Sequence, residues 1–336
     1  MTETDPIYNL ARILRSHILN QVIVSVVRAD IPSILKERRL SSNDVADLCG
    51  IPAEKVHKLL VVISELGIAE RLGPDLFCGN EATALLERDS GRLWGQALLA
   101  GGLYYDVWSQ LDYSLATGES AFEHMHGVTM WEFFEQNPEE AEWFGRTMGA
   151  GSRLVSEEIL DTGLFDGTLK VVDVGAGDAS FLTAALQRYP KLSGIAFDIE
   201  AQKSAMESTL IDSGVIDRAE IAVGDMFEGL PRCGDLYVFK GVVHNWPSRK
   251  ITKLLSQLVS ELDPGARVAI IERPLPPEQE VNMNRAINSL TMTLLFGAAD
   301  RTTEEYAALL GEAGLNTSSV CLETSGMSLI VGQKVA

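Results

Sequence analysis

The chain of 336 residues has little positive charge, few cysteines and no long uninterrupted apolar run. Its formal net charge of −19 disfavours binding to nucleic acid or to anionic membranes. Because no run of about 18 apolar residues and no basic-then-apolar leader occurs, we expect a soluble, cytoplasmic protein without a membrane segment. The four cysteines are too widely spaced for a disulfide framework or a zinc site, so we expect reduced thiols. Small neutral or cationic ligands fit this composition best.

The hydrophobic content of 46% is enough for a full core, and the length allows two domains. From residue 169 onward, apolar segments alternate with helical stretches, a pattern that predicts a doubly wound parallel sheet. The expected strands are Lys170–Val174, Ser193–Phe197, Ala219–Val223, Leu236–Phe239 and Arg267–Ile271. The tail 318–332 contains two strand-like segments around a Ser-Gly turn, which predicts an antiparallel pair at one edge of the sheet.

Residues 8–100 have a helical pattern. Residues 40–50 predict a capped helix that ends at a glycine, a second helix opens at Pro52, and residues 65–77 predict a small hairpin. This order is typical of a winged helix, but the basic residues of the second helix stand beside Glu54 and Glu65, which favours dimerisation over DNA binding. We therefore predict a dimerisation domain over 1–100, connecting helices that contribute to a ligand pocket over 101–160, and a catalytic domain over 161–336.

The most informative segment is the strand Val171–Val174, which breaks into the glycine-rich turn Gly-Ala-Gly-Asp-Ala-Ser. Such a turn can hold a pyrophosphate at a helix N-terminus, but the dinucleotide pattern requires a third glycine where Ala179 and Ser180 stand. Asp178, inside the turn, would repel a phosphate. An acidic lining suits a cationic, phosphate-free ligand instead, and S-adenosylmethionine is the commonest cofactor of that kind.

In an open parallel sheet, ligands bind outside the carboxyl ends of the strands, so the polar residues at these ends are candidates for the site. They are Asp173, Gly175, Asp198, Asp225, Lys240 and Glu272. Asp198 ends the second strand, where a carboxylate can accept both ribose hydroxyls. Asp225 is followed by Met226 and Phe227, a combination that suits an adenine, with the carboxylate accepting from the amine and an apolar side chain covering a ring face.

Several segments in order along the chain carry a specific resemblance: 171–177, 197–198, 224–227, 230–231, 240–246, 271–272, 300–302 and 309–314. With these motifs the chain resembles the dimeric S-adenosylmethionine-dependent O-methyltransferases that act on small, often aromatic, secondary metabolites. The similarity extends over nearly the whole chain. It implies a class I methyltransferase, Rossmann-like catalytic domain behind an N-terminal winged-helix domain. It also implies S-adenosylmethionine as the cofactor, a small-molecule substrate and a homodimer formed through the N-terminal domain.

The resemblance assigns roles to residues by position. His244 matches the general base that removes the proton of the acceptor hydroxyl, while Glu272 and Asp300 match acidic residues that orient it. Contacts to the cofactor are implied for Asp173, Gly175, Asp198, Asp225, Met226, Phe227, Lys240 and Ser152. Residues of the substrate pocket are implied at Trp143, Phe144, Met148, Asn245, Trp246, Met292 and Phe296.

The chain departs from the family's pattern at three places. One is the segment Trp246-Pro-Ser-Arg, which lacks the acidic residues common just after this tryptophan, and we expect it to alter only a helix start. Ala176 and Ala179 replace glycines, so we expect their Cβ atoms to crowd the cofactor. Asn245 stands where the family usually has an aspartate, which removes a negative charge beside the base. We expect no metal, because His124 and His126 have a metal-like spacing but lack a third ligand.

Three alternatives remain open. The same fold can methylate carbon or nitrogen, or it can bind the cofactor for chemistry without methyl transfer. A ligand-responsive winged-helix regulator is the third alternative, and it requires a basic recognition face. The sequence identifies neither the acceptor molecule, nor the atom methylated, nor the pathway.

Overall fold

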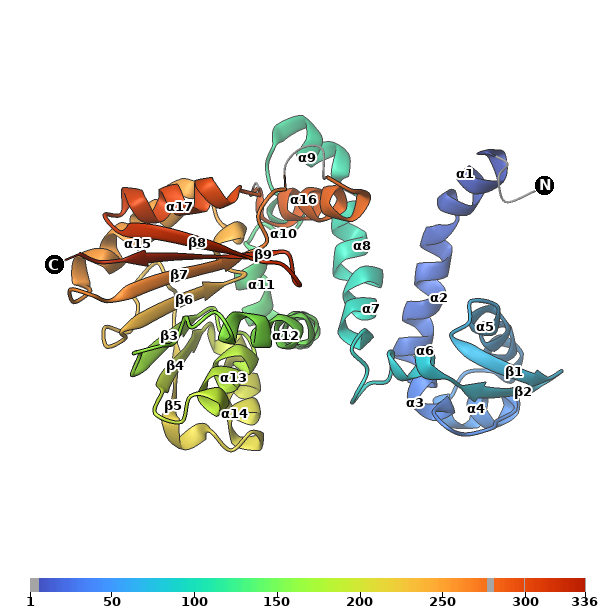
Figure 1. Ribbon diagram of the computed structural model, residues 1–336. Helices are drawn as coiled ribbons and strands as arrows, with labels where there is room; N and C mark the ends of the chain where they lie inside the picture. Colours follow the sequence, from blue (N-terminus) through green and yellow to red (C-terminus); the bar gives the residue numbers. More distant parts are fainter. Residues whose placement is uncertain (1–5, 277–280, 299, 336) are drawn as a thin grey trace. The chain divides into compact units, whose positions relative to one another are not determined.

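The computed structural model describes residues 6–276, 281–298 and 300–335; of residues 8 and 149–154 within these ranges, it describes the backbone only. The chain divides between Asp106 and Val107 into two compact units (Figure 1). The first unit is helical with one small hairpin, and the second contains the large sheet.

Within residues 6–106, the structure describes seven helices, two strands and most of an eighth helix. They are α1 (Pro6–Leu14), α2 (Ser16–Arg28), α3 (Ile31–Leu35), α4 (Ser42–Cys49), α5 (Ala53–Glu65), β1 (Ala69–Gly73), β2 (Leu76–Gly79), α6 (Glu81–Ala84), α7 (Trp94–Gly101) and α8 (Leu103–Trp108). Ser41 caps α4 in a reciprocal capping box with Asp44, and Gly50 ends that helix in the left-handed conformation. Helices α4 and α5 with the antiparallel β1–β2 hairpin confirm the predicted winged helix.

The basic side chains of α5 have acidic partners. The Lys58 Nζ lies 2.7 Å from a carboxylate oxygen of Glu54, and the Nδ1 of His57 lies 2.9 Å from Asp75. These partners offset the positive charge that a DNA-reading helix presents to phosphates. The structure therefore gives no support to the regulator alternative.

One described stretch, Asn9–Arg28 near the N-terminus, is long and apolar enough to cross a membrane by length and composition, and 17% of its window is buried. This finding does not contradict the expectation from the sequence. That expectation rested on uninterrupted apolar runs, whereas here scattered arginines such as Arg12 and Arg15 interrupt a stretch of high average hydropathy. By itself such a stretch is weak evidence, since core helices and signal sequences have the same property.

The second unit begins with helices and continues with alternating strands and helices. Its helices are α9 (Leu111–Thr117), α10 (Ala121–His126), α11 (Met130–Gln136), α12 (Pro138–Leu160), α13 (Ser180–Arg188), α14 (Lys203–Asp212), α15 (Ser248–Glu261), α16 (Met283–Phe296) and α17 (Thr303–Glu312), with short 3₁₀ turns η1 (Glu200–Gln202), η2 (Ile216–Arg218) and η3 (Val243–Asn245). Its strands are β3 (Lys170–Val174), β4 (Ser193–Asp198), β5 (Ala219–Val223), β6 (Leu236–Lys240), β7 (Arg267–Glu272), β8 (Asn316–Leu322) and β9 (Met327–Gln333).

The seven strands form one sheet in the order β5-β4-β3-β6-β7-β9-β8. The first five are parallel, and β9 and β8 add an antiparallel pair beyond β7. All five predicted parallel strands are confirmed to within one residue. Four of them are apolar runs buried on both faces, whereas β5 is the edge strand, with Glu220 and Val223 exposed. The predicted C-terminal pair and the fold class are also confirmed.

Helices cover both faces of this sheet. Figure 1 shows α13 and α14 on one side, and α15 with α17 on the other. Helix α15 is amphipathic, and its buried face packs on the sheet in one core cluster. The residues of this face recur at helical spacing: Ile251, Leu254, Leu255, Leu258 and Val259. The rigid sheet between the two layers fixes the positions of the strand ends.

The turn after β3 uses three left-handed residues, Gly175 (φ 72°), Gly177 (φ 59°) and Ala179 (φ 58°). Ala179 has no exposed surface and packs in the core beside Phe181. The expectation that its Cβ crowds the cofactor is therefore wrong, because this methyl group points into the protein. Ala176 is half-buried and packs against the same core.

We predict that Gly175→Ala destabilises the fold more than Gly177→Ala. Both substitutions place a side chain in the left-handed region, which costs about 1–2 kcal/mol. At Gly175 an added Cβ would also lie 2.5 Å from the Val242 Cγ2, whereas at Gly177 nothing lies within 4 Å. Urea unfolding of both variants measures the difference, and equal losses of unfolding free energy would contradict the predicted contact.

Candidate functional site

Four charged side chains lie at the carboxyl ends of neighbouring strands. Asp173 on β3, Asp198 on β4, Lys240 on β6 and Glu272 on β7 reach the same edge, because these strands are parallel and in register. Buried charges are costly unless they are paired or hydrogen-bonded. Their concentration at one edge therefore marks this edge as the candidate site.

Asp173 is 3% exposed, and among the described residues its Oδ2 has no hydrogen-bond partner. Burial raises the pKa of Asp173 to about 7, although the charge of Lys240 opposes this change. Burial lowers the pKa of Lys240, and the charges of Asp173 and Glu272 oppose that shift. The two side chains thus stabilise each other's charges beneath the glycine turn.

Asp198 connects the end of β4 to the glycine turn. One carboxylate oxygen accepts the Gly177 N–H at 2.7 Å, and the other accepts the Ile199 N–H at 2.7 Å. Burial raises the pKa of Asp198 to about 6, while the two backbone donors act in the opposite direction. A carboxylate has further lone pairs, so Asp198 keeps the capacity to accept from a ligand.

The segment after β5 places Asp225 at the surface, where its Oδ1 accepts the Phe227 N–H at 2.8 Å. The Phe227 ring makes an edge-to-face contact with Trp246 at a centroid distance of 4.7 Å, and Met226 packs against the core. Phe227 therefore joins the segment after β5 to the one that carries His244.

This edge fits a cofactor with a cationic centre. Its carboxylates, including Asp178, outnumber the ammonium of Lys240, so the local field favours positive charge. The space beside Gly177 is open where a Cβ would stand, as a close approach by a ligand requires. Asp178 accepts the Ser180 N–H at 3.0 Å at the start of α13, which satisfies a donor that a phosphate would otherwise bind.

His244 lies in η3, just after β6, and Glu272 at the end of β7 holds it. The His244 Nδ1 lies 3.0 Å from Glu272 Oε2, and the His244 backbone N–H donates to Oε1 at 3.2 Å. Glu272 is 1% exposed, so this carboxylate lies almost fully out of water. When the proton of the neutral ring is on Nδ1, next to Glu272, the lone pair of the ring is on Nε2.

The pKa of His244 is the balance of opposing effects. Burial lowers it, but the charge and hydrogen bond of Glu272 and the charge of Asp300 outweigh burial and the repulsion from Arg301, so the pKa is raised above its usual value. Asp300 thus acts on the imidazole through its charge.

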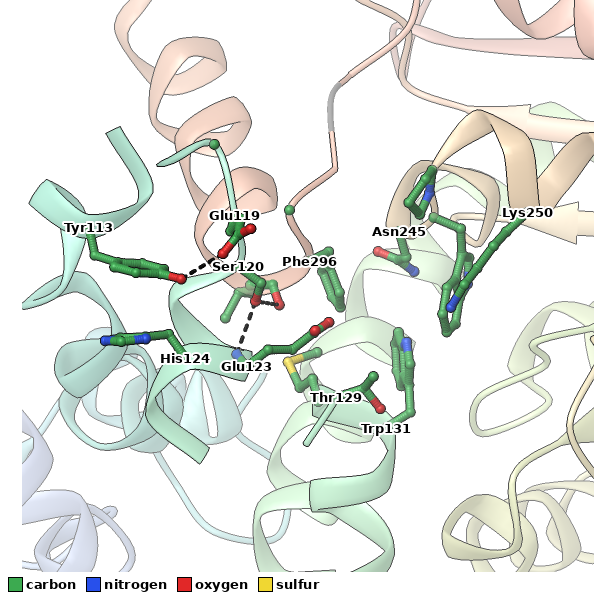
Figure 2. A pocket seen from close by; sticks show the side chains of 16 residues that line it. Tyr113, Glu119, Ser120, Glu123, His124, Thr129, Trp131, Asn245, Lys250 and Phe296 are labelled. Carbon is green, nitrogen blue, oxygen red and sulfur yellow. Dashed lines mark hydrogen bonds between the residues drawn. The ribbon is translucent and has the colours of Figure 1, made fainter. Parts of the chain in front are cut away.

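A cavity of about 590 Å³ lies within the second unit, next to the segment 245–247 that follows His244. It is lined by Tyr113, Gly118, Glu119, Ser120, Glu123, His124, Thr129, Met130, Trp131, Asn245, Trp246, Pro247, Lys250, Leu295, Phe296 and Gly297. Figure 2 shows side chains from α9 and α10 on one side and those of the His244 loop and α15 on the other. The cavity is thus bounded by helical segments beside the strand ends.

Aromatic rings form one wall of the cavity. Trp131 stacks on Phe296 at 5.6 Å and an interplanar angle of 17°, and on Trp246 at 6.3 Å and 28°. The opposite end is acidic: Glu119 accepts the Tyr113 O–H at 2.7 Å, and the Glu123 carboxylate points into the cavity (Figure 2). Flat aromatic walls suit a planar ligand.

Only some of the residues predicted for the substrate pocket line this cavity. Asn245, Trp246 and Phe296 line the cavity. Phe144 lies behind its wall, in edge-to-face contact with Trp131 at 5.8 Å. The other predicted residues do not line this cavity: Trp143 and Met292 are half-buried, and Met148 is 48% exposed.

The side chain of Ser152, a predicted cofactor contact, lies outside the described residues. The sequence interpretation missed Glu119, Glu123, Trp131 and Lys250 as lining residues. The aromatic run at 130–134 was a usable signal for Trp131. The others lie on surface segments with no pattern that distinguishes them.

His124 and His126 have aromatic neighbours. His124 stacks on Tyr113 at 3.8 Å, and His126 lies 4.5 Å from Phe122 and 4.8 Å from Phe133 between ring centroids. In the part of the chain that the structure describes, no group of three or more His, Cys, Asp or Glu side chains is placed to hold a metal ion. The two histidines thus contribute to helix packing.

Comparison with known proteins identifies the family to which this chain is similar. A model of the O-methyltransferase domain matches residues 108–316. The mitomycin biosynthesis 6-O-methyltransferase of Streptomyces lavendulae is 28% identical over 292 residues, 86% of this chain and 83% of that protein. The phenazine O-methyltransferase of Lysobacter antibioticus is 25% identical over 329 residues, 97% of this chain and 96% of that protein.

Solved structures agree. A mitomycin 7-O-methyltransferase matches with a TM-score of 0.89 at 25% identity, over 98% of this chain and 97% of that chain. Human N-acetylserotonin methyltransferase, solved in complex with S-adenosylmethionine, matches with a TM-score of 0.86 at 19% identity over 100% of both chains, which shows the shared fold. These matches confirm the resemblance, the fold class and the enzyme class, and they agree with S-adenosylmethionine as the cofactor.

We predict that Glu272→Gln lowers the pKa of His244, because it removes the carboxylate that favours the imidazolium. At a fixed pH a smaller fraction of His244 is then protonated. Titration of the five histidine ring signals by NMR measures this directly, with His244→Ala identifying the signal. The other four histidines are internal controls. An unchanged pKa for His244 alone would refute the role of Glu272.

Proposed function

Because the chain belongs to the O-methyltransferase family, we propose that it transfers the methyl group of S-adenosylmethionine to a hydroxyl of a planar aromatic metabolite, with His244 as the general base. The single observation that carries this proposal is the pair formed by buried Glu272 and partly buried His244, beside an aromatic-walled cavity. A base, its orienting carboxylate and space for an acceptor are what deprotonation of a bound hydroxyl requires.

The protein's own part in the reaction is orientation and proton transfer. Glu272 fixes the ring through Nδ1, so Nε2 takes up the hydroxyl proton, and the carboxylates of Glu272 and Asp300 stabilise the imidazolium that forms. S-adenosylmethionine supplies an electrophilic methyl group on a sulfonium. Holding the oxygen in line with that group contributes a further large share of the rate.

The strand ends are the proposed cofactor site. Asp198 would accept the ribose hydroxyls, and Asp225 with Met226 and Phe227 would contact the adenine. Gly175, Asp173 and Lys240 would form the floor, and Ser152 would contact the methionine carboxylate. The acidic edge and the open space beside Gly177 support this placement.

The proposed acceptor follows from the cavity and the relatives. Two relatives are named for mitomycin and phenazine, and stacked Trp131, Trp246 and Phe296 offer flat surfaces for a planar ring system. The acidic end, with Glu119 and Glu123, favours an acceptor that carries hydrogen-bond donors or positive charge away from the methylated hydroxyl.

We predict that His244→Ala lowers turnover about a hundredfold or more, because a general base typically contributes 10²–10⁴-fold. Affinity for S-adenosylhomocysteine, measured by calorimetry, should not change, since the imidazole is held by Glu272 and not by the strand ends. Methyl transfer to dihydroxynaphthalene and hydroxyphenazine probes, detected by mass spectrometry, provides the turnover.

His57→Ala is the control, because His57 lies in the first unit, pairs with Asp75 and does not line the cavity. It should retain turnover within a few-fold. Absence of calorimetric binding would refute the methyltransferase proposal, and equal turnover of both variants would remove the base role from His244.

We propose further that the chain forms a homodimer through the first unit. Among the side chains that the structure describes in α1 and α2, five large apolar ones are more than half exposed: Ile7, Leu10, Ile13, Leu14 and Ile18. A contiguous apolar face of this kind is typical of a protein interface. It also accounts for the high average hydropathy of Asn9–Arg28.

We predict that the double substitution Leu10→Asp and Ile13→Asp converts the dimer to a monomer, because it would bury unpaired charges at the interface. Light scattering after size-exclusion chromatography measures the mass. Leu169→Asp is the control, since Leu169 is 64% exposed but lies in the second unit. A monomeric unsubstituted protein would contradict the proposal.

A further inference from the structure

Arg301 is a buried arginine whose guanidinium makes three hydrogen bonds to the segment around His244. It is 6% exposed and precedes Thr302, the N-cap of α17. Its backbone carbonyl accepts the Leu275 N–H at 2.8 Å, and its guanidinium lies over the buried Tyr306 ring at 5.8 Å. Both the main chain and the side chain of Arg301 are thus fixed.

The guanidinium spans the turn that carries His244. Its Nη1 donates to the Val243 carbonyl at 3.1 Å, and its Nη2 donates to the Trp246 carbonyl at 2.6 Å. Its Nε donates to the Ser248 Oγ at 3.2 Å, at the start of α15. The residues on both sides of His244 are therefore held by one rigid, planar fork.

Glu272 holds the same turn from another direction. It accepts the His244 backbone N–H and lies 3.0 Å from Nδ1, whereas Arg301 binds the carbonyls that flank the histidine. Trp246, whose carbonyl Arg301 binds, also lines the acceptor cavity. The position of the base relative to the cavity thus depends on both contacts.

We propose that Arg301 is a positioning residue for the reaction: its guanidinium clamps η3 so that the His244 ring faces the acceptor hydroxyl. This inference rests on the proposed function of His244. A lysine at this position offers one point-like ammonium and cannot bind two carbonyls and a hydroxyl in a planar fork. An error of about 1 Å in the placement of a catalytic group can cost about 10²-fold in rate.

Arg301 also acts on the base through its charge. The charged groups that influence His244 are Glu272 on β7 and Asp300 and Arg301 before α17; only Arg301 favours the neutral imidazole. Position and charge can be separated, because Arg301→Lys keeps the charge and loses the fork, whereas Arg301→Met loses both.

The experiment compares Arg301→Lys and Arg301→Met with a matched control, Arg218→Lys. Arg218 also donates to three backbone carbonyls, those of Leu186, Tyr189 and Leu192, but it lies in η2 away from His244. The readouts are thermal stability, kcat and KM with the hydroxyphenazine probe, S-adenosylhomocysteine affinity, and the NMR signal and pKa of His244.

We expect Arg301→Lys to lower kcat about 10- to 100-fold, with KM changed less and cofactor affinity unchanged. Arg301→Met should lower kcat similarly and, in addition, raise the pKa of His244. Arg218→Lys should lose thermal stability with kcat and the His244 signal unchanged.

The inference is overturned if kcat and the His244 chemical shift stay native in Arg301→Lys, or if Arg218→Lys reduces kcat as much. If the native protein transfers no methyl group, the proposed function fails instead. The His244 signal still tests the clamp in that case, because it reports the ring environment without turnover.

Discussion

The buried ion pair between Glu272 and His244 is the interaction on which the rest of the site depends. Glu272 ends β7, which lies between parallel β6 and antiparallel β9, so the carboxylate sits in the interior of the sheet and not at its margin. A carboxylate out of water requires compensation: the His244 backbone N–H donates to one of its oxygens, and the imidazole lies 3.0 Å from the other. The C-terminal hairpin, although remote in sequence, thereby contributes to the burial of Glu272, since without β9 the strand that carries Glu272 would be an edge strand open to water.

The charged residues at the other strand ends are likewise compensated by opposite charges or by backbone donors. The opposite charges of Asp173 and Lys240 reduce the pKa shifts that burial causes in each other. Both carboxylate oxygens of Asp198 accept backbone N–H groups, one of them from the glycine turn. The turn, the helix that starts at Ser180 and the end of β4 are therefore mechanically linked by one carboxylate. A cationic ligand would reduce the repulsion among these acidic groups, so folding of the edge and binding of the ligand are coupled energetically.

Much of the scaffold could be predicted from the sequence, because buried parallel strands are continuous apolar runs and helix caps are local. Lys170–Val174 and Ser41 are examples, and the polar residues at the strand ends followed from the topology alone. The cavity wall was harder. Trp131 and Glu123 come from helices whose positions depend on tertiary packing, and no local pattern shows that a guanidinium such as that of Arg301 will span a turn 55 residues earlier in the chain. The orientation of Ala179 was misjudged for a related reason, since a left-handed turn directs its methyl group inward and the sequence does not show which way a turn faces.

The acceptor cavity and the strand-end site are built from different kinds of segment. Tyr113, Glu119, Glu123 and Trp131 lie on short helices and loops that add no strand to the sheet, whereas Asp173, Asp198 and Glu272 end its central strands. Substitutions in the first group alter the shape and charge of the acceptor space while they leave the sheet core and the buried ion pair intact. Under the proposed function, acceptor range can therefore diversify during evolution, or be redesigned in the laboratory, at low risk to folding and to the reaction itself.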